Sequence, residues 1–306
     1  MSTDRCQSCP GCASEELVEI GKLPDSRWFA GTRLEEPLPG GWLCRCSTCG
    51  LKFRNPANVD VVNSQLYNND TAATWVADDA RADWDLIVRY VSEELPQGGK
   101  VLDFGCYTGG LLERLGARYQ RFGIEVNRVA SDIASKKIGR DLWPSIDEVP
   151  DELRFDVIIA ADVIEHLTNP MSIIEQLTSR LCDSGVLIIT TGDADNYLWN
   201  RFGANWWYCF YPEHIAFISE NWLRHIARDA SISVDRCESF CYKKLGLARR
   251  VSDRMQMYFY GVLPNVYLSL AKLFLKLAGR PDLQSLPGTG LSRDHLFIVL
   301  SRADRN

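Results

Sequence analysis

KVLDFGCYTGGLLERL, residues Lys100–Leu115, joins a short apolar run to a helical pattern through a turn that contains three glycines. The apolar run ends at Asp103, and the apolar spacing that is typical of a helix begins at Leu111. This order predicts a strand, a tight loop and a helix N-terminus. Such a loop brings backbone N–H groups and a positive dipole end close to a ligand at the carboxyl edge of a parallel sheet. The stretch therefore predicts a ligand-binding loop, with an ordinary strand–helix turn as the alternative.

Apolar runs and helical patterns alternate after this loop. The runs expected to form strands, together with the one that ends at Asp103, are 121–126, 141–143 (the weakest), 155–161, 185–191, 231–240 and 295–301. Short apolar runs separated by helices indicate a mostly parallel sheet that is covered on both faces. The sequence therefore predicts an α/β fold with a doubly wound, seven-stranded, Rossmann-like sheet.

The composition is that of an ordinary globular protein. The chain has 306 residues, of which 46% are hydrophobic and 24% charged, and its formal net charge is −6. The acidic balance argues against wholesale binding of nucleic acid. The N-terminal residues lack the apolar segment of a signal peptide, so we expect a reducing, cytoplasmic location.

Six of the eleven cysteines lie within residues 6–49, in the groups CQSCPGC and CRCSTC. In a reducing compartment such clustering indicates metal binding rather than disulfides. Two residues between ligands allow one turn to present both sulfurs to one ion, and four thiolates close a structural Zn²⁺ site. The expected ligands are Cys9, Cys12, Cys46 and Cys49. Cys6 could replace a member of the first pair, and Cys44 lies near the second.

The chain divides by pattern into three parts. We expect a zinc-ribbon-like domain at 1–56, a helical linker or cap at 57–97, and the sheet domain at 98–306 with a helical insertion at about 242–294. One face of the helical cap carries Trp84, Ile87, Val88 and Val91.

The insertion is unusually apolar between residues 255 and 278. Pro264 and the lysines at 272 and 276 argue against a membrane-spanning helix. A buried helical pair or a homodimer face is the first interpretation, and peripheral contact with a membrane surface is the alternative.

Acidic side chains close three of the predicted strands: Asp103 the first, Glu125 the second and Asp162 the fourth. In a doubly wound sheet these ends line one crevice, where ligands bind. A carboxylate after the second strand suits ribose hydroxyls. The loop lacks the G-x-G-x-x-G spacing of dinucleotide sites, and Asp103 would repel a pyrophosphate. A cationic nucleoside without phosphate therefore fits better.

The motifs VLDFGCYTGG, FGIEVN, FDVIIAADVIEHLTNP and GVLIITT, in this order, resemble those of class I S-adenosylmethionine (SAM) dependent methyltransferases. The resemblance covers roughly residues 98–302. The paired CxxC groups ahead of it are similar to those of zinc-bearing methyltransferases that modify sugars and glycans in bacteria.

The resemblance implies a set of cofactor-binding positions. They are Asp103, Gly105, Tyr107, Gly109, Glu125, Asp147 (or its neighbour Glu148) and Asp162. The first positions would line the methionine and ribose portion of SAM, Glu125 would hold the ribose hydroxyls, and Asp147 would lie beside the adenine. The family usually has glycine where Tyr107 stands. Its side chain would either point into the cofactor crevice or widen the loop.

Three catalytic candidates follow from the chemistry of methyl transfer to a hydroxyl, which needs a proton acceptor: His166, His214 and Glu165. The spacing in DVIEH would place Asp162, Glu165 and His166 on one side of a helical turn, where they could alternatively bind a divalent ion such as Mg²⁺. His214 follows a segment with eight aromatics among residues 197–211 that could stack on the acceptor. We expect His225 and His295 to be structural.

The function that we expect is transfer of a methyl group from SAM to a small molecule or glycan, at a hydroxyl of a sugar, glycan or related secondary metabolite. One alternative is a non-catalytic SAM-binding scaffold whose zinc domain recruits a partner. A nucleic-acid methyltransferase is a further alternative, but the chain lacks an NPPY-like tetrapeptide after the fourth strand and a basic run in residues 1–56.

Overall fold

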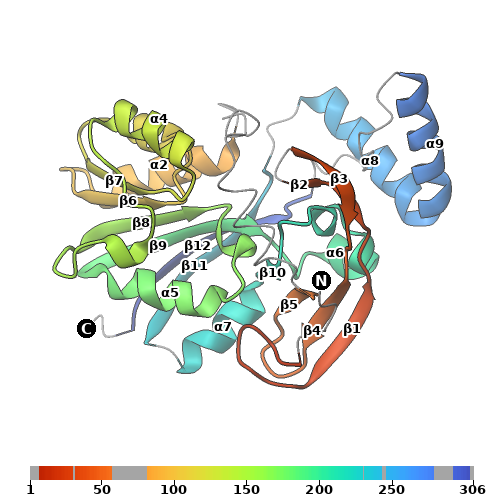
Figure 1. Cartoon of the computed structure of the whole chain (residues 1–306), viewed down its shortest axis with the longest axis horizontal. Helices are drawn as coiled ribbons and strands as arrows, with labels where there is room; N and C mark the ends of the chain where they lie inside the picture. The colour runs from red at the N-terminus through yellow and green to blue at the C-terminus, as the bar shows by residue number, and fades with distance from the viewer. Residues whose placement is uncertain are drawn as a thin grey trace.

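The computed structural model describes residues 7–29, 32–56, 81–229, 231–242, 246–278 and 292–303. A six-stranded sheet forms its centre (Figure 1). Across the sheet, the strands are β11 (Ile232–Phe240), β12 (His295–Arg302), β9 (Leu181–Gly192), β8 (Phe155–Ala161), β6 (Lys100–Phe104) and β7 (Gln120–Ile124). Neighbouring strands from β9 to β7 are parallel, whereas β12 is antiparallel to both of its neighbours. The predicted α/β class with a doubly wound sheet is confirmed.

The weakest of the predicted strands, residues 141–143, is reduced to a single parallel bridge between Ile124 and Trp143. Pro144 follows directly and has no N–H to continue a ladder. The Trp143 ring instead stacks on Phe122, with the ring centroids 5.7 Å apart. Within the described residues the sheet therefore has six full strands rather than seven.

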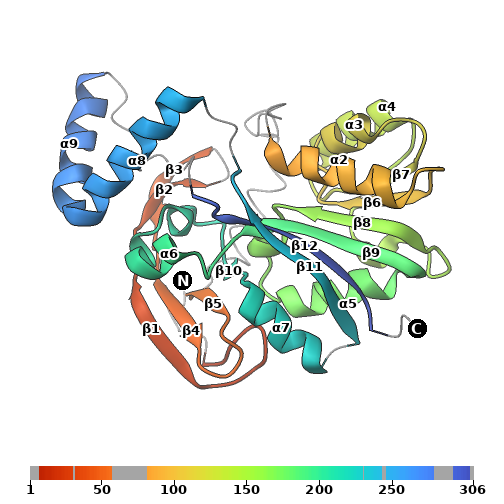
Figure 2. The same ribbon diagram turned by 180° about the vertical axis from the view of Figure 1, so that it is seen from behind.

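Helices cover both faces of the sheet (Figures 1 and 2). They are α2 (Ala82–Glu94), α3 (Gly110–Leu115) and α4 (Arg128–Ile138) on one face, and α5 (Pro170–Ser179) and α7 (Glu220–Asp229) on the other. Val101 belongs to the core beneath α2 and α3, while Leu102 belongs to the core beneath α5 and α7. This alternation explains why the strands read as continuous apolar runs.

The cysteine module, residues 7–29 and 32–56, forms a second and smaller sheet. Its strands are β1 (Leu17–Lys22), β4 (Trp42–Cys46) and β5 (Lys52–Asn55), with a hairpin of β2 (Ser26–Phe29) and β3 (Thr32–Leu38) beside them. A short strand from far along the chain, β10 (Ala216–Phe217), pairs antiparallel with β5 and completes this sheet. The module is therefore joined to the large domain by backbone hydrogen bonds. Of the expected linker at 57–97, the structure describes only the part from residue 81.

The aromatic segment between β9 and β10 folds into α6 (Tyr197–Phe202) and the 3-10 turns η4 (Gly203–Asn205) and η5 (Trp207–Phe210). Trp199, Trp206 and Tyr208 are buried in a core that they share with Leu23 and Leu43 of the cysteine module. These three aromatic side chains thus hold the two sheets together. Tyr211, in contrast, is exposed.

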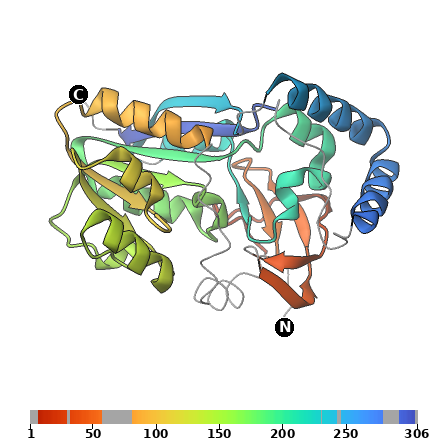
Figure 3. The ribbon, with the colours of Figure 1, turned by 90° about the horizontal axis from the view of Figure 1, so that it is seen from above.

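The insertion forms a helical pair, α8 (Leu247–Val262) and α9 (Pro264–Leu277), at one end of the molecule (Figure 3). Within these helices only Asp253, Tyr260 and Tyr267 are buried. The expectation of a buried helical pair is wrong for this chain by itself, because most of its apolar side chains face solvent. No helix in the described part of the chain is both long and apolar enough to span a bilayer.

Candidate functional site

The loop between β6 and α3 depends on two glycines with positive φ. At Gly105 (φ 78°) a Cβ atom would lie 2.6 Å from Val163 Cγ2, and at Gly109 (φ 74°) it would lie 3.0 Å from Ala134 Cβ. Both positions therefore exclude larger residues. The loop is closed by hydrogen bonds from the N–H groups of Gly105 and Cys106 to the Ile124 carbonyl.

Tyr107 adopts φ 48°, the left-handed conformation that glycine adopts readily. Such a conformation costs a residue with a side chain about 1–2 kcal/mol. Its N–H donates to Glu125 Oε2 at 2.7 Å, which offsets part of that cost. The departure from glycine at this position is thus accommodated by the backbone conformation.

Two carboxylates flank this loop at the carboxyl edge of the sheet. Asp103 lies near the end of β6, and Glu125 directly follows β7, where its Oε1 accepts from Asn127 N–H at 2.8 Å. Burial raises the pKa of Asp103 to about 7, although the charge of Arg81 opposes this. Burial also raises the pKa of Glu125. A cationic ligand in this edge would favour the ionised form of both groups.

The remaining predicted cofactor neighbours lie on the turn η2 (Ile146–Glu148). The chain reaches this turn from Trp143, whose carbonyl accepts from Glu125 N–H at 3.0 Å. Asp147 and Glu148 are both exposed. They are therefore open to solvent, a few residues along the chain from the backbone that contacts Glu125.

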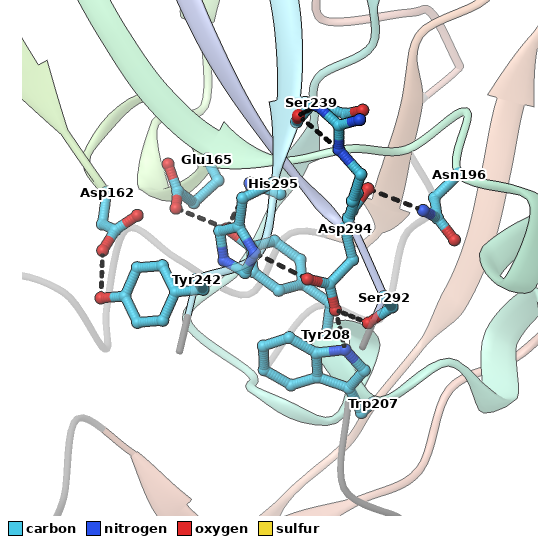
Figure 4. A network of polar contacts seen from close by, with 12 residues as sticks. Asp162, Glu165, Asn196, Trp207, Tyr208, Ser239, Tyr242, Ser292, Asp294 and His295 are labelled. Atoms are coloured by element: carbon cyan, nitrogen blue, oxygen red, sulfur yellow. Dashed lines mark hydrogen bonds and ion pairs between the residues drawn. The ribbon is translucent and has the colours of Figure 1, made fainter. Parts of the chain in front are cut away.

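Asp162 follows β8 with φ 54°, again in the left-handed region. Its Oδ2 accepts from Arg81 Nη2 at 2.7 Å. The same oxygen accepts from the Tyr242 hydroxyl at 2.8 Å (Figure 4). Its Oδ1 is buried and has no hydrogen-bond partner among the described residues. A buried, unsatisfied carboxylate oxygen is costly in the unliganded protein and is available to a ligand hydroxyl.

We expected Asp162, Glu165 and His166 on one side of a helical turn, but Asp162 lies outside the turn that carries the other two. The left-handed residue Asp162 redirects the chain, and the turn that follows is the short 3-10 helix η3 (Ile164–His166). Glu165 Oε1 accepts from the Tyr208 hydroxyl at 2.6 Å instead. Burial, with the charge of Asp162, raises the pKa of Glu165 to about 7.

His166 and His214 lie together, with ring centroids 5.0 Å apart. His166 Nδ1 is 3.1 Å from the Glu213 carbonyl, and His214 Nδ1 is 2.9 Å from the Tyr208 carbonyl. Because carbonyls only accept, these contacts assign the proton of each neutral ring to Nδ1. Burial lowers the pKa of His166 and lowers that of His214 well below its ordinary value. Both rings are therefore neutral near pH 7.

His214, rather than Asp162, joins Glu165 and His166 in a group that could hold a metal ion. One ligand-type atom from each of the three lies within 4.8 Å of the others. In the structure, a divalent ion at Glu165 and His166 would therefore have His214 as its third ligand instead of Asp162.

The structure adds side chains that the sequence did not single out. His295, which we expected to be structural, is buried beside Tyr208 and stacks on Tyr242, with ring centroids 4.5 Å apart (Figure 4). Its Nδ1 is 3.0 Å from Asp294 Oδ1, and Asp294 Oδ2 accepts from Trp207 Nε1 at 3.0 Å. Burial alone would lower the pKa of His295, but Asp294 outweighs it and the pKa is raised. The only local sequence signal for this site was the polar pair Asp294 and His295, where the apolar run of β12 begins.

Arg54 of β5 links the cysteine module to the loop that carries His214. Its guanidinium is buried and donates to the carbonyls of Cys209 (2.8 Å), Tyr211 (3.0 Å) and His214 (3.1 Å). Lys52, two residues earlier on β5, donates to Asn200 Oδ1 at 2.8 Å. The only sequence signal for these contacts was the presence of two charged residues in the short segment LKFRNP, residues 51–56.

The four predicted zinc ligands converge at one end of the cysteine module. The sulfurs of Cys9, Cys12, Cys46 and Cys49 lie within 4.8 Å of one another. The Sγ–Sγ distances of the pairs 9–49 and 12–46 are both 3.6 Å, and Gly11 N–H donates to Cys9 Sγ at 3.3 Å. Cys44 is also buried but is not part of this group of four sulfurs, while Cys6 lies outside the described residues.

Comparison with known proteins identifies the region that carries the site. The family described as a methyltransferase domain matches residues 76–234. This range includes the glycine loop, both flanking carboxylates and the histidine pair, whereas the cysteine module, the helical pair and β12 lie outside it.

Among curated relatives, ubiquinone biosynthesis O-methyltransferase from Rhodopseudomonas palustris is 31% identical over 105 residues, which are 31% of this chain and 40% of the relative. The enzyme of the same name from Thiobacillus denitrificans is 26% identical over 178 residues, 52% of this chain and 76% of the relative. The chain thus spans about 40% of the length of the first of these relatives.

Solved structures of methyltransferases also align with the chain. Coclaurine N-methyltransferase, bound to N-methylheliamine and S-adenosylhomocysteine, is 12% identical with a TM-score of 0.47 and covers 80% of this chain and 82% of its own. The N-methyltransferase NodS from Bradyrhizobium japonicum is 14% identical with a TM-score of 0.45 and covers 80% and 98%.

Proposed function

Because this chain belongs to the methyltransferase-domain family, we propose that it transfers a methyl group from SAM to a hydroxyl of a sugar, glycan or related small molecule. The observation that carries the proposal is the closed glycine loop, whose Tyr107 N–H is held by Glu125 beside the buried Asp103. A loop without the dinucleotide spacing, flanked by two carboxylates, favours a cationic nucleoside over a pyrophosphate.

The cofactor contacts in this proposal come from this sheet edge. The Glu125 carboxylate accepts backbone N–H groups of Tyr107, Asn127 and Val126, and a carboxylate has about four acceptor sites, so it can still accept from a ribose hydroxyl. Asp103 would balance the positive charge of the methionine portion, and Gly105 and Gly109 would allow the ligand to approach the backbone closely. Asp147 or Glu148 would lie beside the adenine. SAM, when bound, supplies a methyl group on a sulfonium that an oxygen nucleophile displaces in line.

The proton of the acceptor hydroxyl would go to a histidine. In our proposal His214 is the general base, because its Nδ1 contact with the Tyr208 carbonyl assigns the basic lone pair to Nε2. As the oxygen–carbon bond forms and the sulfur–carbon bond breaks, the O–H proton would move to this nitrogen. His166 would orient the His214 ring or replace it as base, and Glu165 would stabilise the imidazolium. A base positioned in this way contributes about 10²–10⁴-fold in rate.

The surroundings of Asp162 support a polyhydroxylated acceptor. Its unsatisfied Oδ1 can accept from a ligand hydroxyl, and the half-buried aromatic side chains of Tyr242 and Trp207 lie beside His295 in the same region. Carboxylates and aromatic rings together suit a sugar, because the hydroxyls of a sugar can donate to carboxylates and its C–H face can pack on an aromatic ring.

We also propose that the four cysteines hold a structural Zn²⁺ ion. A tetrahedron with Zn–S bonds of about 2.3 Å has S–S edges of about 3.8 Å. The two measured pairs, at 3.6 Å, are close to this value, and four thiolates leave no open position for catalysis. In this proposal the chain consists of a zinc-ribbon-like domain (1–56), a linker or cap (57–97) and a catalytic domain (98–306).

Calorimetric titration with SAM tests the proposed function. We expect wild-type affinity to fall as the pH is lowered through about 7, because Asp103 then takes up a proton and loses the charge that favours a cation. Asp103→Asn should bind SAM about tenfold or more weakly, without this pH dependence.

Asp132→Asn is the matched control, since it removes an exposed carboxylate from α4 and should leave affinity unchanged. Failure of wild type to bind SAM would contradict the proposal. SAM binding without turnover on any sugar or glycan acceptor would favour the non-catalytic scaffold instead.

A further inference from the structure

The helical pair presents an apolar surface that the described chain leaves uncovered. On α8 five exposed apolar side chains recur every three to four residues, so they lie on one face of the helix. They are Leu247, Val251, Met255, Tyr258 and Val262, and each is between 52% and 80% exposed. The opposite face attaches the helix to the protein through Tyr260, whose hydroxyl donates to the Asn205 carbonyl at 2.7 Å.

Helix α9 carries a second stripe of the same kind. It consists of Val266, Leu270, Leu273, Phe274 and Leu277, between 46% and 78% exposed. The other side of α9 packs on α8 through Tyr267, which contacts the Phe259 and Tyr260 rings and bonds Gln256 Oε1 at 3.0 Å. The packing between the helices is thus already satisfied without these ten side chains. Exposed apolar surface of this extent marks an interaction site.

Charge identifies the kind of partner. The helical pair holds five cations and one anion, a net charge of +4 within a chain of net charge −6, so the rest of the chain carries −10. The cations, Arg249, Arg250, Arg254, Lys272 and Lys276, are all exposed on the two helices that carry the stripes. Apolar stripes combined with basic side chains are the composition of helices that lie in the surface of an anionic bilayer.

A second copy of the chain fits this surface less well. In a two-fold dimer each patch meets its own copy, so two patches of +4 would face each other across the interface. Like charges at close range oppose such an association. An anionic lipid surface is attracted by the same charges and accepts the apolar side chains between its headgroups.

We infer that α8 and α9 form a docking surface for an anionic lipid bilayer, with the two helices lying in the headgroup region. The apolar stripes enter the upper part of the acyl layer, while the arginines and lysines remain level with the lipid phosphates. This inference does not depend on the proposed methyl acceptor.

Co-sedimentation of the full chain with vesicles tests this inference. We expect binding to phosphatidylcholine vesicles that contain about 30% phosphatidylglycerol, and much weaker binding to phosphatidylcholine alone. Added salt should weaken the binding because it screens the cations. The double variant Phe274→Glu with Leu277→Glu should bind about tenfold or more weakly, since it removes two stripe side chains and adds two negative charges.

The double variant Asn265→Glu with Ser269→Glu is the matched control. It adds the same two charges to exposed positions of α9 outside the stripe, so its binding should fall by about threefold or less. Equal losses in both variants would mean electrostatic attraction without insertion and would overturn the inference. So would the absence of vesicle binding, and a stable dimer in light scattering that only the stripe variant dissociates would assign the surface to a second copy.

Discussion

The cysteine module and the helical pair both lie outside the region that matches the methyltransferase family, yet they distribute polar and apolar side chains in opposite ways. In the cysteine module, two cations of β5, Lys52 and Arg54, are buried against the large domain. In the helical pair the cations are exposed and so are ten apolar side chains. Buried, directional hydrogen bonds fix the first region relative to the loop that carries His214. The second region is fixed by a few aromatic contacts and offers the rest of its surface to a partner.

The largest effect should come from the cysteine cluster. Zinc binding contributes about 10–16 kcal/mol in zinc-finger peptides, which exceeds the roughly 2–5 kcal/mol that a single buried side chain contributes. We expect Cys46→Ser to abolish stoichiometric zinc binding and to unfold the module, as measured by metal analysis and by the loss of a thermal transition.

Cys44→Ser is the control, because Cys44 is also buried on β4 but does not belong to the sulfur cluster. It should retain zinc and lose only about 1–3 kcal/mol of stability. Loss of zinc in both variants, or in neither, would contradict the assigned ligands.

The next largest effect concerns His214, the proposed general base. His214→Asn should lower kcat by about 10²–10⁴-fold while leaving SAM affinity close to that of wild type. Because burial lowers the folded-state pKa of His214 well below 6.5, the ring stays neutral as the pH falls toward that value. We expect wild-type kcat to be flat near neutral pH and to fall only well below pH 6.5.

The pH profile also separates the candidates. An acid limb near pH 7 would indicate Glu165 instead, because burial raises the pKa of that carboxyl to about 7. Such a limb, retained in His214→Asn, would contradict the histidine mechanism.

Arg54 tests whether the cysteine module supports the loop that carries His214. Arg54→Met removes the donor to the carbonyls of Cys209, Tyr211 and His214 and should cost about 3 kcal/mol of stability, since buried carbonyls are left unpaired. We expect a lower kcat with nearly unchanged SAM affinity, because His214 loses its support while the carbonyls that Arg54 contacts do not belong to the glycine loop. Arg45→Lys, on the exposed face of β4, should change neither quantity.

Local patterns in the sequence predicted the parts of the molecule that depend on local physics. The period and length of the apolar runs predicted the strands, and the spacing of two residues between cysteines predicted the cysteine pairs. The prediction of a strand at residues 141–143 was wrong, because Pro144 cannot continue the hydrogen bonding that Trp143 begins.

The prediction of the site was incomplete where its residues come from segments far apart in the sequence. Arg81 and Tyr242 meet on Asp162, each about 80 residues away along the chain, and no period or spacing connects them. His295 likewise joins the site through the antiparallel strand β12, whose place in the sheet is a tertiary property. The exposure of the helical pair could not be predicted either, because the sequence pattern of an apolar stripe is the same whether or not protein covers the stripe.

The smallest effect should come from replacing an exposed leucine of the helical pair by serine, compared with the same replacement of a buried leucine in the cysteine module. Leu277 is 78% exposed, so Leu277→Ser removes little buried surface and should change the free energy of unfolding by no more than about 0.5 kcal/mol. Leu43→Ser, at a fully buried position of the cysteine module, should cost about 3–5 kcal/mol because it leaves a cavity and buries a hydroxyl. Thermal or urea unfolding measures both. A cost above about 1 kcal/mol at Leu277 would mean that the chain itself covers this stripe, and the contrast between a region built for the fold and a region built for a partner would not hold.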